Sequence, residues 1–459
     1  MIHVMRKHAS LLAILLVYFI VGGLYAVRTP AWQTPDEPAH YNVVRQMANG
    51  RLPVIEAGDY DQEFIRQVVY TPPAFPAEVP LTLMSYEDWQ PPLYYLLQTP
   101  LFILTNGSLT AMRLFSLVMG AGVVILAYGL AWLLFAGARW LALTTAVFVA
   151  LLPQHLAIMA SANNDALAEL IIAAVLVVLV HWIQEEKRAM IKAQSVKNTP
   201  PLSPIFALQS FTTRGLLLLG LLLGLGFITK GTVYPFALLV AFTVLWRYWR
   251  QWLPFITAGF LVAIPAFALG ALLWIRNIVV YGRLDVLAKA AHDSVVVGQP
   301  RTAEWVATYG LQQTLQQFVT TTFNSFWGQF GWMTHPMDAR FYPVLWLFTL
   351  AWLVGLIITL FVWWDRQQPP LAAILVLIGS FLLTLGVHVT YNLKFVQHQG
   401  RYLFPALLPI SVGVAVGLGF WLRPFSWRQP WLKYSLPLGL GFLLVGLNGW
   451  VIIRLLPQL

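Results

Sequence analysis

Two neighbouring carboxylates stand in the first hydrophilic segment of this 459-residue chain. Asp36 and Glu37 lie between Pro35 and Pro38, shortly after the first long apolar run. A carboxylate can take a proton from a hydroxyl group, and carboxylate oxygens can also hold a hard divalent cation. The same residues could simply cap a short helix, since Asp is favoured at that position. Spacing alone leaves catalysis and capping open, and the two roles are compatible.

A second acidic position follows the third apolar run. Asp165 comes directly after Asn163 and Asn164, and Glu169 stands four residues later. This spacing places both carboxylates on one face of a helix. Glu169 would lie about one turn inside the membrane, where an ionisable group suggests function by default. The plainer alternative is a helix cap beside a water-lined polar spot.

Cationic residues stand at the ends of three further apolar runs: Lys230, Arg276 and Arg401. Arginine can contact a phosphate through two donors and lysine acts as a point charge, so the three predict binding of a phosphate or pyrophosphate. The alternative for each is a side chain that reaches from the apolar run to the membrane surface. Further candidates for substrate binding beside these charged positions are His40, His398 and Tyr402.

The composition places these residues in a membrane protein. Hydrophobic residues make up 59% of the chain and charged residues 10%, and the mean hydropathy is +0.70. Soluble domains are about 25% charged, so an ordinary soluble enzyme and a disordered chain are both excluded. Cysteine is absent, which excludes a disulfide framework and a thiolate metal site.

Recurring apolar runs predict an all-α polytopic membrane protein with a single transmembrane domain, 1–459. Each run is long enough to cross a hydrocarbon core of about 30 Å. We expect the first run to be a retained anchor, because Leu24-Tyr25-Ala26 does not resemble a signal-peptide cleavage site. Gly220 and Gly224 form a small-xxx-small pair that predicts close helix packing. The eleven predicted spans are 9–27, 110–135, 140–160, 166–183, 214–229, 232–247, 252–275, 342–363, 371–391, 402–421 and 434–456.

The charge distribution predicts the orientation. With the N-terminus inside, the inner segments hold fourteen Lys and Arg and three acids, and the outer segments hold fourteen Lys and Arg and fifteen acids. This asymmetry follows the positive-inside rule. The net charge of +10 is therefore attributed to topology and contact with anionic lipid, not to nucleic acid.

Two long outer loops interrupt the spans, at 28–109 and 277–341. In the first loop, Pro38 to Ala48 predicts a short helix that Asn49-Gly50 ends. Leu93–Leu104 predicts a second, apolar helix that is short for a span, so we expect it to lie on or dip into the outer leaflet. Whether it crosses the membrane stays open.

Taken in order, these motifs resemble the GT-C superfamily of polytopic glycosyltransferases, which includes protein mannosyltransferases and the aminoarabinose transferase of lipid A. The set is also similar to a broad bacterial membrane-protein family within that group. Gln90 departs from the pattern, because several relatives have a histidine before the two prolines. The motifs that carry the resemblance are Asp36-Glu37, Pro91-Pro92-Leu93-Tyr94-Tyr95, Asp165 and Arg401-Tyr402-Leu403-Phe404-Pro405.

The resemblance implies transfer of a hexose or pentose from a polyprenyl-phosphate donor to an envelope glycan, lipid or protein. It implies a multi-pass protein of the cell membrane with its site on the extracytoplasmic face. Asp36 or Glu37 would be the general base for transfer with inversion, and the three cations would stabilise the departing phosphate. His40, Asp165 and His398 would position the substrates. A divalent cation, Mg²⁺ or Mn²⁺, held by Asp36 and Asp165 is a further option that the basic residues could replace.

Two other classes of function stay open from the sequence. A transporter or flippase of lipid-linked glycans would show internal repeats and polar residues at the bilayer midplane, whereas the polar residues here gather at one face. A non-catalytic assembly protein would keep Asp36 and Asp165 far apart.

Overall fold

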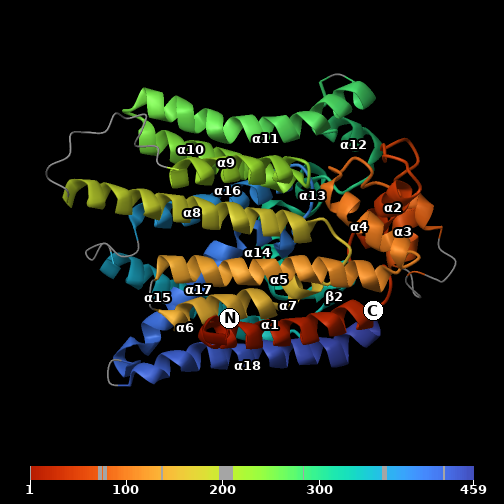
Figure 1. Ribbon diagram of the computed structural model, residues 1–459. Coiled ribbons are helices and arrows are strands. Elements are labelled where there is room, and N and C mark those ends of the chain that lie inside the picture. Colours follow the sequence, from red (N-terminus) through yellow and green to blue (C-terminus); the bar gives the residue numbers. More distant parts are fainter. Residues whose placement is uncertain are drawn as a thin grey trace.

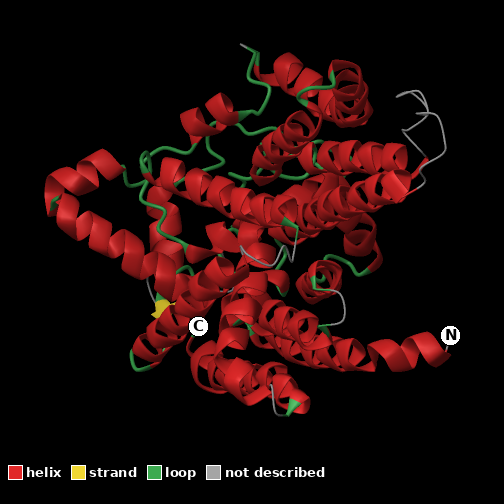
Figure 2. Ribbon diagram, turned by 90° about the vertical axis from the view of Figure 1, so that its left-hand side faces the viewer, coloured by secondary structure: helices red, strands yellow, loops and turns green. Residues whose placement is uncertain are grey.

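The computed structural model describes residues 2–70, 75, 80–135, 138–195, 210–282, 284–363, 370–426 and 429–459. Helices form most of this part of the chain, which agrees with the predicted all-α class (Figure 1). Its two strands, β1 (Gln329–Phe330) and β2 (His335–Pro336), form one antiparallel pair. The turned view shows this pair near the C-terminus (Figure 2).

Nine helical stretches of the described residues are long and apolar enough to cross a membrane. Three of them begin with a short 3-10 turn: η2 (Gly231–Val233) leads into α10, η3 (Gly400–Ala406) into α17 and η4 (Pro430–Tyr434) into α18. The helices are α1 (Ile2–Arg28), α5 (Leu109–Leu134), α8 (Asp165–Ser195), α10 (Tyr234–Tyr248), α11 (Trp252–Tyr281), α15 (Phe341–Trp363), α16 (Leu371–Asn392), α17 (Leu407–Ser426) and α18 (Ser435–Trp450).

Two of the eleven predicted spans differ from the structure. The run 140–160 forms α6 (Arg139–Leu151) and α7 (Pro153–Met159), which meet at an angle of 64°. A proline lacks the amide hydrogen that a continuous helix needs, so Pro153 begins a new helix. The pair is a tenth span only if both parts count as one. The run 214–229 forms α9 (Ser210–Phe227), whose apolar part, Thr213–Phe227, is shorter than a span.

The close approach of α9 to α11 confirms the prediction from Gly220 and Gly224. A Cβ atom on Gly220 would lie 2.3 Å from the carbonyl oxygen of Val262, and one on Gly224 would lie 2.9 Å from that of Pro265. A side chain at either position would push the helices apart. Small residues permit this kind of packing within a membrane.

The two long loops hold further helices. Between α1 and α5 the chain forms α2 (Glu37–Ala48), α3 (Gln62–Tyr70), η1 (Leu81–Leu83) and α4 (Leu93–Leu104), and the two helices predicted in this loop are confirmed. Figure 1 shows α2, α3 and α4 at one end of the bundle, together with α12; we call this the site end. Between α11 and α15 lie α12 (Lys289–Val295), α13 (Thr302–Tyr309), α14 (Leu311–Trp327) and the strand pair.

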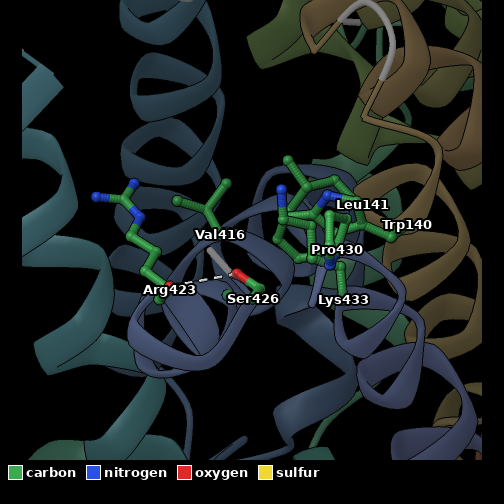
Figure 3. Close-up of a pocket in the computed structure, with 8 residues that line it drawn as sticks. Trp140, Leu141, Val416, Arg423, Ser426, Pro430 and Lys433 are labelled. Atoms are coloured by element: carbon green, nitrogen blue, oxygen red, sulfur yellow. Dashed lines mark hydrogen bonds between the residues drawn. The ribbon is translucent and has the colours of Figure 1, made fainter. Parts of the chain in front are cut away.

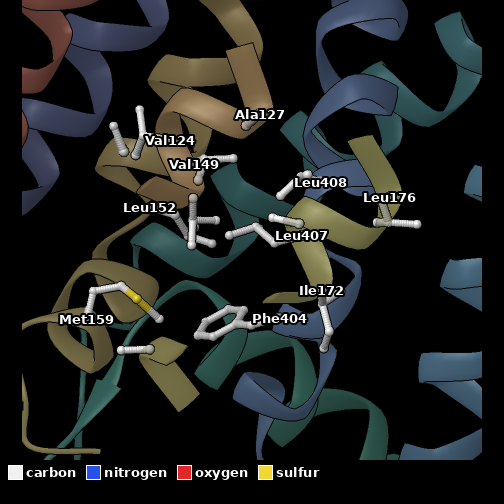
Figure 4. Close-up of a cluster of buried hydrophobic side chains, with 14 of the residues drawn as sticks. Val124, Ala127, Val149, Leu152, Met159, Ile172, Leu176, Phe404, Leu407 and Leu408 are labelled. Carbon is white, nitrogen blue, oxygen red and sulfur yellow. The ribbon is translucent and has the colours of Figure 1, made fainter. Parts of the chain in front are cut away.

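A continuous apolar core runs beneath the site end. Phe404 and Leu407 face Ile172 of α8, Leu152 of the α6–α7 break and Val124 of α5 (Figure 4). These side chains are buried. Because η3 leads directly into this core, the residues at its beginning are held in place by the packing of its end.

Candidate active site

Asp36 occupies the N-cap position of α2 but does not cap it. No hydrogen bond joins its side chain to the first turn, and its φ of 68° lies in the left-handed region, which is uncommon for a residue other than glycine. The carboxylate instead accepts hydrogen bonds from Arg401 Nη2 at 2.5 Å and from the Tyr86 hydroxyl at 3.1 Å. Strained backbone of this kind gathers at functional sites. The expected cap is therefore wrong for this side chain.

Arg401 reaches Asp36 from the beginning of η3. Its side chain is 8% exposed, and its Nε and Nη1 atoms are buried without a hydrogen-bond partner. The preceding Gly400 donates its amide to Ser325 Oγ at 2.7 Å. A Cβ atom on Gly400 would lie 2.2 Å from the backbone nitrogen of Phe326, so only glycine fits against α14. Buried donors normally find partners, and the two free ones make Arg401 a strong candidate for binding an anion.

Lys230 and Asp165 form the second ion pair of the site. Lys230 Nζ lies 2.6 Å from Asp165 Oδ1, and both side chains are largely shielded from solvent. Lys230 lies in the turn that leads from α9 into η2, and Asp165 begins α8. The amide of Leu93 donates to the carbonyl of Ile228 at 2.9 Å, which ties α4 to the turn that carries Lys230.

A chain of polar contacts links the first long loop to the start of α8. The Tyr95 hydroxyl lies 2.8 Å from His40 Nδ1 and accepts from Asn164 Nδ2 at 3.2 Å. The same Asn164 group donates to Gln90 Oε1 at 3.2 Å, and Gln90 Nε2 donates to Glu87 Oε2 at 2.7 Å. Gln90, the departure from the GT-C pattern, thus connects two of the site's elements.

Electrostatics separate the two carboxyl groups of this loop. Burial alone would raise the pKa of Asp36, but the positive charges of Arg401 and Lys230 outweigh it and hold the pKa below its usual value. Burial and the negative charge of Asp36 raise the pKa of Glu87 to about 8. At neutral pH Asp36 is therefore ionised and Glu87 protonated. Opposite shifts of neighbouring carboxyls are typical of acid and base assignments.

His40 stays neutral in the same surroundings. Burial and the positive charge of Lys230 lower its pKa to about 3. Its imidazole lies against the Tyr95 ring, with the ring centres 5.8 Å apart. A neutral histidine in this position can donate or accept a hydrogen bond but adds no charge to the site.

Glu37 lies apart from this chemistry, in a buried ion pair. Its carboxylate is fully buried and accepts from Arg113 Nε at 2.8 Å and Nη2 at 2.6 Å, and from the amide of Ala162 at 3.1 Å. Arg113 also donates to the carbonyls of Ala26, Thr29 and Pro30. The pair joins the end of α1, the start of α2 and the loop before α8. We missed Arg113 in the sequence, although a lone charge inside the predicted span 110–135 was the available signal.

The other predicted site residues, Tyr402, Arg276 and His398, differ in their contacts. Tyr402 is next to the cluster, with the Arg401 guanidinium 5.5 Å from its ring centre. Arg276 donates to the carbonyl of Pro53 and lies over the Tyr281 ring. His398 packs edge-on against Phe318. In the described part of the chain, no hydrogen bond or ion pair joins Arg276 or His398 to Asp36 or Asp165.

Glu87 and Tyr86 are candidate site residues that we did not predict. They stand a few positions before the Pro91-Pro92 motif, within the acidic loop. Their signal was this neighbourhood, but nine acids populate 28–90 and the spacing did not single out one of them. Glu169, in contrast, lies where the helical spacing put it and pairs with His155 at 3.0 Å, with both side chains buried.

The donor set does not fit a divalent cation. No group of three His, Cys, Asp or Glu side chains converges in the described ranges. The carboxylates of Asp36 and Asp165 are each engaged by a cationic side chain, and Mg²⁺ or Ca²⁺ would need several oxygen ligands in their place.

The helical architecture is similar to that of solved oligosaccharyltransferase structures, which agrees with the GT-C-like polytopic fold that the motif resemblance predicted. One match is the Archaeoglobus fulgidus oligosaccharyltransferase tethered with an acceptor peptide containing the NVT sequon: TM-score 0.53, 11% identity, 98% of this chain and 55% of that one. Another is AglB from the same organism, in complex with an inhibitory peptide and a dolichol-phosphate. The TM-score is 0.50 and the identity 11%, and the match covers 98% of this chain and 56% of AglB.

A third solved structure is ArnT from Cupriavidus metallidurans bound to undecaprenyl phosphate, with a TM-score of 0.47, 13% identity, and coverage of 90% of this chain and 60% of that one. The chain therefore spans 55–60% of the length of these three proteins. No protein-family model and no curated protein matches the sequence.

Proposed function

We propose that this protein transfers a sugar from a polyprenyl-phosphate donor to an acceptor of the cell envelope, at the extracytoplasmic face of the cell membrane. The observation that carries the proposal is the contact between Asp36 and Arg401, whose two remaining buried donors have no partner. A base and an anion-binding group therefore lie side by side. The similar AglB structure contains a dolichol-phosphate, which is a lipid of the donor's kind.

The proposed reaction is a single displacement. The acceptor oxygen bonds to the anomeric carbon as its proton passes to the Asp36 carboxylate, and the bond from that carbon to the phosphate oxygen breaks. The departing polyprenyl phosphate takes the bonding electrons and gains negative charge. Attack opposite the leaving group inverts the anomeric centre. Positioned base catalysis of this kind contributes roughly 10²- to 10⁴-fold.

Arg401 and Lys230 stabilise the departing phosphate. Arg401 offers Nε and Nη1 to the phosphate oxygens while Nη2 stays on Asp36. Lys230 is held by Asp165 close enough to influence Asp36 electrostatically. Prearranged cations act strongly in a site that excludes water. This role for Asp165 is positioning rather than proton transfer.

Glu87 serves as a hydrogen-bond donor in this proposal. It is protonated at neutral pH, because burial and Asp36 raise its pKa to about 8. Gln90 orients one of its oxygens, and the hydroxyl on the carboxyl can then donate to a sugar or acceptor oxygen. Glu37 is assigned the structural task of holding the loop through Arg113.

The proposal can be tested in vesicles that contain the purified chain. The measurement is the transfer of label from polyprenyl-phosphate hexose or pentose to an envelope fraction. We expect Asp36→Asn to reduce transfer by roughly 10²-fold or more. Glu63→Gln is the matched control, because Glu63 is an exposed acid of the same loop, paired with Arg66. Full transfer by Asp36→Asn would remove Asp36 from the mechanism.

The same vesicles separate the transferase from a flippase. A flippase would carry the labelled lipid across the bilayer with the bond between sugar and phosphate intact. In that case neither the parent chain nor Asp36→Asn would release free polyprenyl phosphate, and the substitution would alter only the movement of the lipid. Release of free polyprenyl phosphate that depends on Asp36 favours the transferase.

A further inference from the structure

A pocket lies at the opposite end of the bundle from the candidate active site. Its volume is about 560 Å³, within the range of roughly 300–1,000 Å³ typical of small-molecule sites. Residues from the start of α6, the end of α17 and η4 line it. The helix α17 follows Arg401 at the site end and finishes at Ser426, so the pocket and the candidate active site are separated by the length of this span.

The mouth of the pocket is cationic and polar. Arg423 and Ser426 contribute from α17, and Lys433 contributes from η4 on the other side (Figure 3). Lys433 is only partly exposed, and no ion pair among the described residues includes it. The Arg423 guanidinium lies 5.8 Å from the Phe420 ring centre. Cationic residues from two separate segments therefore line the same pocket.

The floor of the pocket is apolar and lies deeper in the bundle. Val416 and Gly419 precede Ser426 by ten and seven residues, so the lining extends about 15 Å along the helix at 1.5 Å per residue. The Trp140 ring covers Gly419 so closely that a Cβ atom there would lie 2.5 Å from it. Tryptophan is enriched at the headgroup level of membranes.

We propose that this pocket binds an anionic phospholipid from the leaflet at that end of the protein. The phosphate group would lie between Arg423 and Lys433, with the Ser426 hydroxyl beside it, and the upper part of an acyl chain would lie along Val416 and Leu141. Charge complementarity decides for an anionic lipid over a zwitterionic one, since the lining residues include two cations and no acid. Basic pockets between spanning helices are suited to such headgroups.

Native mass spectrometry of the full chain, released from nanodiscs of phosphatidylglycerol mixed with phosphatidylcholine, tests this site. We expect Arg423→Gln/Lys433→Gln to retain phosphatidylglycerol roughly tenfold less than the parent chain, because each basic group near an anionic headgroup strengthens its binding several-fold. Retention of phosphatidylcholine should not change. The matched control is Arg214→Gln/Arg250→Gln, which removes two exposed cations from the same end but outside the pocket.

A second variant keeps the charges and fills the floor. Val416→Phe should reduce phosphatidylglycerol retention while leaving Arg423 and Lys433 in place, and its melting temperature reports whether the fold is intact. Equal retention by the parent chain and the charge variant would overturn the proposal. An equal loss in the control would show attraction to the whole face instead of a site. Displacement of the lipid by free glycerol phosphate at the same concentration would show a site for small anions and would also overturn it.

Discussion

Asp36 and Glu37 are neighbours in sequence, yet their substitutions should differ in their effect on sugar transfer. Glu37→Gln leaves the Arg113 guanidinium buried, with 3% of its side chain exposed, and without its carboxylate partner. Removing one member of a buried ion pair costs about 3–5 kcal/mol. Arg113 keeps three carbonyl acceptors, so we expect a loss of about 3 kcal/mol in the free energy of unfolding, at the lower end of that range.

A surface pair in the same loop provides the matched comparison. Glu63 and Arg66 are 2.7 Å apart, and their side chains are 58% and 64% exposed. Exposed pairs contribute about 0–1 kcal/mol, so Glu63→Gln should leave the free energy of unfolding almost unchanged. Asp36→Asn also leaves a buried guanidinium, that of Arg401, without its carboxylate partner, so we expect it to lose stability as Glu37→Gln does, but it should in addition abolish most sugar transfer. The three variants therefore separate the pairing of a carboxylate from its chemistry.

Unfolding of the purified chain by sodium dodecyl sulfate, followed by tryptophan fluorescence in mixed micelles, measures these differences. Glu37→Gln/Arg113→Met removes both charges, and we expect it to be more stable than Glu37→Gln because no buried cation remains unpaired. A Glu37→Gln chain that is as stable as the parent but inactive would refute the reasoning. Glu37 would then act in the reaction, and Asp36 would need another role.

Three further predictions follow from the site and its loop. Transfer should fall as pH rises through about 8, where Glu87 ionises; Glu87→Gln keeps a donor and should remove this alkaline decline, and an unchanged pH profile would contradict the assignment. Burial raises the pKa of Asp88 to about 7, so the stability that its proton provides is present below about pH 4, the value for an unfolded chain, and is lost as pH rises through about 7. The melting temperature of the parent chain should therefore fall relative to that of Asp88→Asn as pH rises from about 4 to about 7, and the difference should stay constant above about pH 7. A difference that is constant over the whole pH range would rule out the titration of Asp88. Gly400→Ala should displace Arg401, because its Cβ would meet the α14 backbone, and should reduce transfer roughly 10²-fold. Gly386→Ala, whose Cβ meets nothing within 4 Å, is the control, and equal activity of the two variants would contradict the packing argument.

The fold could be predicted because membrane helices depend mainly on the local pattern of apolar residues in the sequence. Nine spans and the short helices after Pro38 and Pro92 depend on runs of apolar residues and on prolines, which act over a few positions. The break at Pro153 was missed although a proline inside a helical pattern is a signal for one, because the residues on both sides of it are mainly apolar. Its angle depends on how α6 and α7 pack against their neighbours, which no local pattern records.

The candidate site was only partly predictable for the same reason. The spacing of Asp165 to Glu169 put both acids on one helix, but it did not show that one pairs with Lys230 and the other with His155. Sequence order also joined Asp36 and Glu37, whereas the structure turns their carboxylates towards different partners. Arg276 and His398 carried suitable chemistry at suitable depths, and only tertiary packing places them outside the contacts of Asp36.

The pairing of Asp36 with Arg401 joins residues 365 positions apart, whereas Glu37 and Arg113 are separated by 76. At about 5–20 residues per second, the ribosome adds Arg401 roughly 20–70 s after Asp36, and Arg113 roughly 4–15 s after Glu37. The ion pair of Glu37 and Arg113, which holds the first loop, can thus form early in translation. Arg401, which pairs with Asp36, has not yet been synthesised at that point. A nascent chain would stay inactive until almost all of its helices have entered the bilayer.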